Sequence, residues 1–234
     1  MIKRIYIFSL MLFLVSMQTF AQVRFGIKAG FNLANMTDKD RNGTYSNDYK
    51  MKEGFHLGVT AEYSISNNFS LEPGLLYSSK GFTKPEYKAG IDGHTVDEPE
   101  IKITSNYLEV PINAIYKINL GSAKILLNAG PYLAYALSGK LKANKIWFGI
   151  NEDQTERKLK IGNQATDDFK ALDYGLNAGA GIEFKKISLG LQYGLGLANI
   201  APSSDIGYTL NNKVISLSLS YKFGHKSDRK FRHK

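Results

Sequence analysis

An alternation of apolar and polar residues with a period of two runs through most of this chain. In residues 23–34 the odd positions carry Val, Phe, Ile, Ala, Phe and Leu, whereas the even positions carry Arg, Gly, Lys, Gly, Asn and Ala. Successive side chains of a β-strand point to opposite faces, so this period predicts a strand with one apolar and one polar face. The pattern favours an all-β fold.

The same alternation predicts eight strands. We expect them over residues 23–34, 53–65, 69–79, 108–118, 124–137, 172–184, 187–198 and 213–223. Every second connection is long and polar, and we expect loops over 37–52, 80–105, 139–170 and 199–212. The connections after the second, fourth and sixth strands are tight turns. In a meander, alternate connections lie at opposite ends, so all the long loops belong to one rim, as in outer-membrane barrels.

The composition of the two faces distinguishes a barrel in a membrane from a barrel in water. Gly, Ala, Ser and Asn dominate the polar face, and a narrow eight-stranded lumen has room mainly for such small residues. The apolar face carries recurring tyrosines, including Tyr77, Tyr135 and Tyr193, which suit a girdle at the lipid headgroups. We predict an eight-stranded antiparallel up-and-down transmembrane β-barrel, rather than a soluble barrel with an apolar lumen.

Residues 1–21 have the features of an export signal. Lys3 and Arg4 precede an apolar run, and Thr19-Phe20-Ala21 supplies small residues before a cleavage site. The run, about 13 residues long, is shorter than the roughly 20 needed to span a bilayer. We therefore expect a cleaved signal peptide over 1–21, a barrel over 22–224 in the bacterial outer membrane, and a basic periplasmic tail over 225–234.

Four segments resemble the PorT-like outer-membrane β-barrel family of Bacteroidota. They are FGIKAGFNLA at 25–34, LEPGLLY at 71–77, YLEVPI at 107–112 and NAGPY at 128–132. The resemblance covers most of residues 22–224 and implies an eight-stranded outer-membrane barrel. The namesake of that family belongs to a machinery that exports proteins, while most members have no assigned activity. Many bacterial barrels end on the aromatic residue of the last strand. In this chain an eleven-residue basic extension follows that aromatic residue, Phe223.

Charged residues on the polar face are the candidate site residues. They are Arg24, Lys28, Glu62, Glu72, Glu109, Lys117, Lys124, Asp173, Glu183 and Lys222. Charges in a packed interior must be paired, so we interpret this set as a structural ion-pair network in the lumen. A catalytic pair of carboxylates is the alternative interpretation.

Few residues suit catalysis or metal binding. The chain has no cysteine, which excludes thiolate metal sites and cysteine nucleophiles. His56 is predicted inside the barrel, and His94 lies in a loop where Ser79 or Ser105 would have to complete a triad. An acidic cluster lacks the ligand spacing of a calcium loop; it consists of Asp92, Asp97, Glu98 and Glu100. We expect no cofactor and no metal site.

We therefore interpret the protein as a non-enzymatic structural or interaction component, with protein-secretion machinery as one candidate assembly. Trp147 and Phe148 in the third long loop are a candidate partner contact, and the basic tail is another. Outer-membrane lipid and lipopolysaccharide are its expected surroundings, and we expect no nucleic acid. A surface adhesin and a lipid-modifying outer-membrane enzyme are the alternatives.

Overall fold

The computed structural model describes residues 23–91, 94–147, 150–164, 166–202 and 207–223. The elements are β1 (Val23–Lys39), η2 (Ser46–Asp48), β2 (Lys50–Ser64), β3 (Phe69–Lys84), β4 (Tyr87–Ile91), β5 (His94–Glu98), β6 (Ile101–Leu120), β7 (Ala123–Trp147), β8 (Ile150–Lys158), β9 (Leu172–Phe184), β10 (Ile187–Gly196) and β11 (Thr209–Lys222). The expected export signal and basic tail lie outside the described residues. In the part of the chain that the structure describes, no helix is long and apolar enough to cross a membrane.

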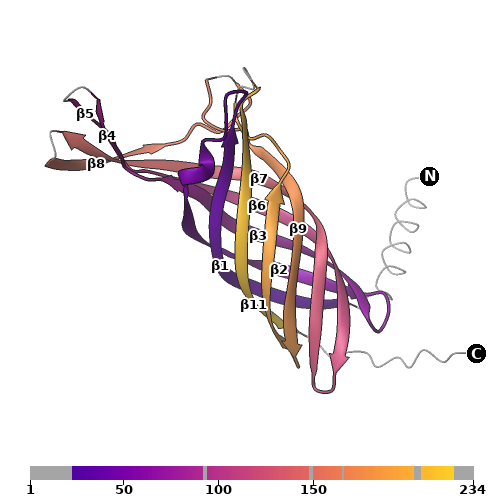
Figure 1. Cartoon of the computed structure of the whole chain (residues 1–234). Coiled ribbons are helices and arrows are strands. Elements are labelled where there is room, and N and C mark those ends of the chain that lie inside the picture. Colours follow the sequence, from indigo (N-terminus) through magenta and orange to yellow (C-terminus); the bar gives the residue numbers. More distant parts are fainter. Residues whose placement is uncertain (1–22, 92–93, 148–149, 165, 203–206, 224–234) are drawn as a thin grey trace, which may run out of the picture.

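Eight of these strands close into an antiparallel barrel (Figure 1). Their order around the barrel is β6-β3-β2-β1-β11-β10-β9-β7, and β7 also pairs with β6, which completes the ring. The strand pairs are antiparallel. Each barrel strand pairs with the barrel strands that precede and follow it in the sequence, and β4, β5 and β8 belong to the connections between barrel strands. The predicted all-β, up-and-down, eight-stranded barrel is confirmed.

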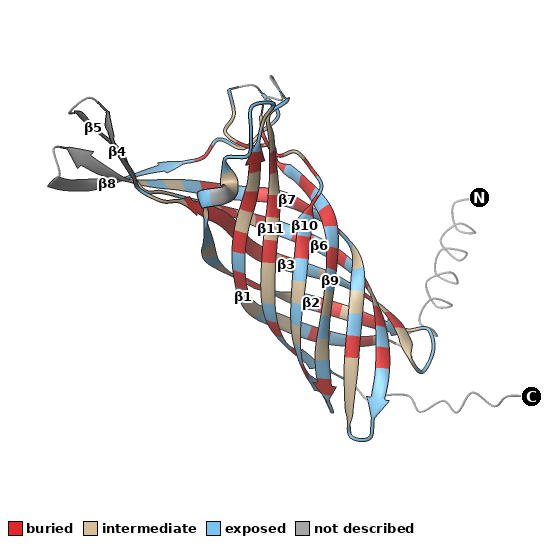
Figure 2. Ribbon diagram, viewed as in Figure 1, coloured by how far each residue is buried: buried red, intermediate tan, exposed pale blue. Residues whose placement is uncertain are grey.

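The apolar face of the strands points outward (Figure 2). Phe31 and Leu219 are 74% and 57% exposed, whereas Asn32, Lys117 and Asp173 on the alternate face are buried. In a bilayer the backbone polar groups must pair with one another and the outer surface must be apolar, and a closed ring of this kind satisfies both demands. The charged residues of the polar face therefore lie in the lumen.

Glycines in the wall allow neighbouring strands to approach closely. A Cβ atom on Gly130 of β7 would lie 1.9 Å from the carbonyl oxygen of Ile112 in β6. A Cβ atom on Gly58 of β2 would lie 2.1 Å from the carbonyl oxygen of Leu75 in β3. These positions admit no side chain unless the backbone moves, which explains why the polar face is rich in glycine.

The two ends of the barrel differ in their connections. At one end Leu120 pairs with Ala123 across a two-residue turn in which Gly121 has a φ of 64°. At the same end Phe184 pairs with Ile187 across a second two-residue turn. We call this the turn end. The long connections lie at the opposite end, the loop end, as the sequence predicts.

The long connections contain more strand than the sequence analysis predicts. β3 runs on to Lys84, β6 already begins at Ile101, and β7 continues to Trp147, where polar loops were expected. The prediction of loops throughout 80–105 and 139–170 is wrong for these residues. Their apolar positions are few and are separated by lysines, so the period of two does not stand out there.

The extended strands form a projection that we call the arm. It consists of residues 80–84, 101–106, 139–147 and 150–158, in which β8 pairs with the outer part of β7. β4 and β5 form a separate two-stranded hairpin between β3 and β6. The arm leaves the loop end of the barrel sideways (Figure 1).

Candidate functional site

Glu62 is the centre of a buried ion-pair network near the turn end. Its carboxylate, with no exposed surface, accepts hydrogen bonds from Arg24 at 2.9 Å and also contacts the ammonium groups of Lys117 and Lys222. Arg24 and Glu62 are direct register partners on β1 and β2, so the strand pairing itself places the two charges together. Desolvation of the carboxylate is offset because three cations surround it.

Two further carboxylates extend this network across the lumen. Glu183 lies 3.2 Å from Arg24 and 3.3 Å from Lys222, and Glu72 lies 3.2 Å from Lys222. Lys28 and Lys124 complete the network, at 3.1 Å from Glu72 and 3.5 Å from Glu183 respectively. We call these eight residues the turn-end network, and seven of the eight barrel strands contribute to it. It contains five cations and three carboxylates.

The remaining two predicted site residues lie in a separate cluster nearer the loop end. Glu109 accepts from the ammonium of Lys80 at 2.7 Å, and Asp173 lies 3.6 Å from the same ammonium. The ammonium also lies 4.4 Å from the ring centre of Tyr132 and 5.1 Å from that of Tyr107. Tyr132 donates to Asp173 at 3.2 Å. We call this group of five residues the loop-end cluster.

Lys80, Tyr107 and Tyr132 are not among the site residues predicted from the sequence, although Tyr132 lies on the polar face predicted to line the lumen, two residues after Gly130. Lys80 was assigned to a loop, although it continues the buried parity of Glu72, Leu76 and Ser78 along β3. This alternation along β3 is the sequence signal that could have identified Lys80 as a lumen residue. Because β3 extends past residue 79, the lysine still points inward and is 4% exposed.

His56 lies in the lumen between a hydroxyl group and an amide. Its Nε2 is 2.9 Å from Oγ of Ser218, and its Nδ1 is 2.8 Å from Oδ1 of Asn32. A base flanked by a hydroxyl and an orienting group is the arrangement that nucleophilic catalysis uses. The adjoining cavity of about 30 Å³ holds only a few water molecules, however, so a lipid chain does not fit beside these groups.

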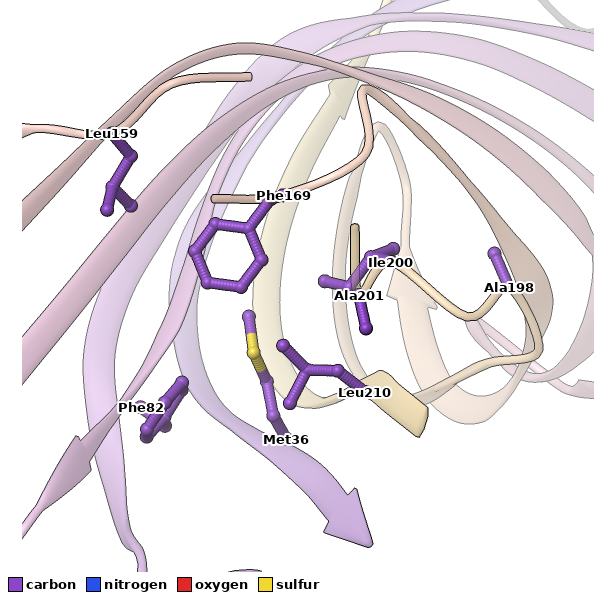
Figure 3. Close-up of a cluster of buried hydrophobic side chains, with 8 residues drawn as sticks. All are labelled: Met36, Phe82, Leu159, Phe169, Ala198, Ile200, Ala201 and Leu210. Atoms are coloured by element: carbon purple, nitrogen blue, oxygen red, sulfur yellow. The ribbon is translucent and has the colours of Figure 1, made fainter. Parts of the chain in front are cut away.

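An apolar cap closes the loop end above the polar lumen (Figure 3). Its buried members come from strand ends and loops: Met36, Phe82, Leu159, Phe169, Ala198, Ile200, Ala201 and Leu210. Tyr49 stacks on Phe82 with ring centres 4.6 Å apart, and burial is the main reason that the pKa of Tyr49 is raised. Backbone hydrogen bonds join the two capping loops, for example from Lys170 to Ile200 at 2.8 Å.

An ion pair joins the cap to the arm. Both terminal nitrogens of Arg157 in β8 donate to the carboxylate of Asp168, at 2.7 and 2.8 Å. The backbone N–H of Lys160 donates to the same carboxylate at 2.8 Å. The hydrogen bonds from Arg157 are the main cause of the lowered pKa of Asp168. This ion pair therefore connects the base of the arm to the loop that carries Phe169 of the cap.

The other candidate residues are only partly described. Trp147 pairs through its backbone with Ile150, and Phe148 lies outside the described residues, so their expected partner contact stays a prediction. His94 pairs through its backbone with Ile91. Ser79 on β3 and Ser105 on β6, which a triad with His94 would need, are both buried. Among the described residues, no group of three or more His, Cys, Asp or Glu side chains could hold a metal ion.

Comparison with known proteins agrees with this architecture. Residues 18–201 match the family model of the outer membrane protein beta-barrel domain, so the chain belongs to that family and is a bacterial outer-membrane β-barrel protein. The match is not specific to the PorT-like group. No curated protein matches the chain.

Several solved structures are similar to this chain at low identity. Neisserial surface protein A is 15% identical with a TM-score of 0.41, over 85% of this chain and 97% of that one. Ail of Yersinia pestis, solved with the heparin analogue sucrose octasulfate, is 16% identical with a TM-score of 0.37, over 86% and 99%. The outer membrane protease OmpT from Escherichia coli is 10% identical with a TM-score of 0.37, over 86% and 96%. Likenesses at this level concern the fold alone.

Proposed function

We propose that this protein is a non-enzymatic interaction component of the outer membrane, whose arm binds a partner outside the cell. The observation that carries this proposal is the filled and capped lumen. Two lumen cavities lined by described residues measure about 30 and 50 Å³, and the apolar cap closes the loop end above them. Known ligand pockets are about ten times larger, and an eight-stranded barrel encloses no aqueous channel.

The arm is the part of the protein best placed to meet a partner. It extends past the barrel on strands that are continuous with the membrane wall, and Arg157 and Asp168 tie its base to the cap. A pre-ordered surface loses little conformational entropy on binding. A component of protein-secretion machinery is the partner suggested by the PorT-like resemblance, with the cleaved signal over 1–21 and the periplasmic tail over 225–234 as parts of the same proposal.

Surface adhesion is the second candidate function, and it uses the same arm. Lipid modification has less support, because the hydroxyl of Ser218 beside His56 is enclosed in the lumen. Trp147 is the last residue of β7 in the arm, so the Trp147-Phe148 pair stays the proposed contact in both cases.

A cross-linked pull-down from solubilised outer membrane tests this proposal. We would replace residues 145–153 by Asn-Gly, which joins β7 to β8 through a two-residue hairpin turn and leaves the barrel unchanged. We expect a stoichiometric partner with the full chain and its loss with the shortened arm. Loss on removal of 225–234 instead would assign binding to the periplasmic side. Recovery of the barrel alone from the full chain would refute a stable protein partner.

A further inference from the structure

The two faces of the arm differ in chemistry. Ile103 and Leu141 on the inner face pack against the cap. On the outer face the side chains of Lys102, Lys140 and Lys142 are each about half exposed. Lys158 of β8 is exposed as well. We call these four residues the lysine patch.

The lysine patch continues the lipid-facing surface of the barrel. On β7 the exposed residues Leu133, Tyr135 and Leu137 belong to the apolar belt. A register shift between Asn106 and Tyr107 leaves Leu137 and Ser138 both exposed, and the alternation then resumes with Lys140 facing outward. The same face therefore changes from apolar to basic as β7 leaves the belt.

Strand pairing places lysine opposite lysine in this patch. Lys102 is the register partner of Lys142 on β7, and Lys140 is the register partner of Lys158 on β8. Like charges directly opposite each other destabilise a sheet. An anion between the strands would remove that cost.

Only part of this charge is neutralised within the described residues. Glu156 lies 2.7 Å from Lys140 and 3.1 Å from Lys142, and Glu100 lies 2.8 Å from Lys102. Four lysines with two carboxylates leave a net charge of +2 on one face of three adjacent strands. The patch therefore has charge available for an anionic ligand.

The height of the patch matches the headgroup layer of the outer leaflet. Lys140 follows Leu137 by three residues, about 10 Å along an extended strand. Leu137 is the last apolar residue of the belt on β7, and we take it as the hydrocarbon edge. With the tilt of about 45° common in such barrels, Lys140 then lies about 7 Å above that edge. The polar layer of each leaflet is roughly 5–8 Å thick. Because a tilted strand leans outward as it leaves the barrel, its lipid-side face also lies over the bilayer, which agrees with the sideways course of the arm in Figure 1.

We propose that the lysine patch binds the phosphate groups of outer-leaflet glycolipid headgroups. Lysine ammonium groups bind phosphate as point charges, and a phosphate monoester carries enough negative charge and acceptor oxygens to serve two opposed lysines at once. This inference depends on membership of the outer-membrane family and not on the protein partner proposed above. Lipid phosphate is favoured over a soluble polyanion because the patch is continuous with the apolar belt.

Binding of lipid A to the full-length folded protein in neutral detergent micelles tests this inference. The probes are diphosphoryl lipid A and the same lipid after removal of both phosphates, with native mass spectrometry as the readout. The test variant is K140Q/K158Q. An exposed ion pair contributes up to about fivefold in affinity, so we expect this variant to bind diphosphoryl lipid A more weakly, by about 25-fold at most. We expect the dephosphorylated lipid to bind weakly to both proteins.

Matched variants separate charge from other effects. K140R/K158R keeps the charge and should retain binding, whereas K185Q/K186Q removes the same charge at the turn end and should bind like the unaltered protein. Equal binding by K140Q/K158Q and the unaltered protein, or equal binding of both lipids, would overturn the inference. Tighter binding of soluble heparin than of lipid A would also overturn it, in favour of a glycan site. The arm shortened at 145–153 retains all four lysines, so loss of a protein partner and loss of lipid binding are distinguishable.

Discussion

The ammonium of Lys80 lies 2.7 Å from the carboxylate of Glu109 inside the barrel, and the two side chains are only 4% and 11% exposed. This pair is part of the loop-end cluster, which contains one lysine and the two carboxylates of Glu109 and Asp173. The cluster therefore depends on its single cation. A buried ion cluster with a single cation is destabilised less by removal of all its charges than by removal of the cation alone.

We expect Lys80→Met to destabilise the barrel by roughly 3–5 kcal/mol, because two carboxylates then remain buried without a cation. Urea unfolding of the protein in lipid vesicles, followed by far-UV circular dichroism, measures the change in the stability of the barrel. The control is the triple variant K80M/E109Q/D173N, which removes all three charges and should recover much of the loss. A Lys80→Met protein as stable as the original would contradict the structural role of this pair.

The turn-end network predicts an asymmetry between its cations and its carboxylates. It has five cations and three carboxylates, and Glu62→Leu leaves Lys117 without its counter-ion, while Arg24 and Lys222 lose one counter-ion each and still contact Glu183. We expect a loss of roughly 3–5 kcal/mol. Lys117→Met removes one of five cations that share three carboxylates, and we expect the free energy of unfolding to fall by about 1 kcal/mol or less. Heat modifiability on semi-native gels ranks the variants, and equal resistance of the two would refute the asymmetry.

The same reasoning applies at a second carboxylate of the turn-end network. Glu72→Leu leaves Lys28 and Lys222 without one of their counter-ions and should lower the heat resistance of the barrel. Because Glu72 contacts two cations and Glu62 contacts three, we expect the smaller loss at Glu72. Unchanged heat resistance of this variant would show that Lys28 finds solvent or another partner at no cost.

The apolar cap should open locally when the ring of one of its two phenylalanines is removed. Phe169→Ala leaves a void between residues of the cap such as Met36 and Leu210, and we expect a loss of about 3 kcal/mol in cap stability. Trypsin should then cleave the capping loops faster while the barrel keeps its heat resistance. Planar-bilayer recordings should still show no conductance, because the lumen beneath the cap is packed. Steady channel currents in this variant would mean that the cap alone closes a pore.

The barrel itself was predictable because its signals are local. The period of two predicts the strands, and the many glycines at the alternate positions identify the face that lines the lumen. Gly58 and Gly130 are examples, because each lies close to the backbone of a neighbouring strand. Alternating long and short connections give the topology. The first two features are visible within a dozen consecutive residues and the third in the spacing of the strands along the chain, so no knowledge of distant contacts is needed.

The loop-end features were not predictable, because they depend on closure of the ring. The cap draws Met36, Phe169 and Ile200 from segments far apart in the sequence, and Met36 and Phe169 each follow and precede polar residues, so no apolar run marks them. His56 meets Ser218 only because β1 pairs with both β2 and β11. The sequence does not predict the arm for a related reason. Its strands are held in extended form by pairing with one another, whereas the apolar pattern within each strand is weak.

The ion pair between arm and cap predicts a defined dependence on pH. Arg157 lowers the pKa of Asp168 in the folded protein, so its contribution to stability is complete above the ordinary aspartate pKa and is lost as the pH falls through the lowered value. The amide proton of Lys160, which is bonded to the same carboxylate, reports this titration by NMR in micelles. We expect a midpoint below about 3.9 and a flat response between pH 5 and 7. Asp168→Asn should abolish the titration and weaken the contact of arm and cap by about 0.5 kcal/mol, whereas a midpoint at or above 3.9 would show that Arg157 does not hold the carboxylate in solution.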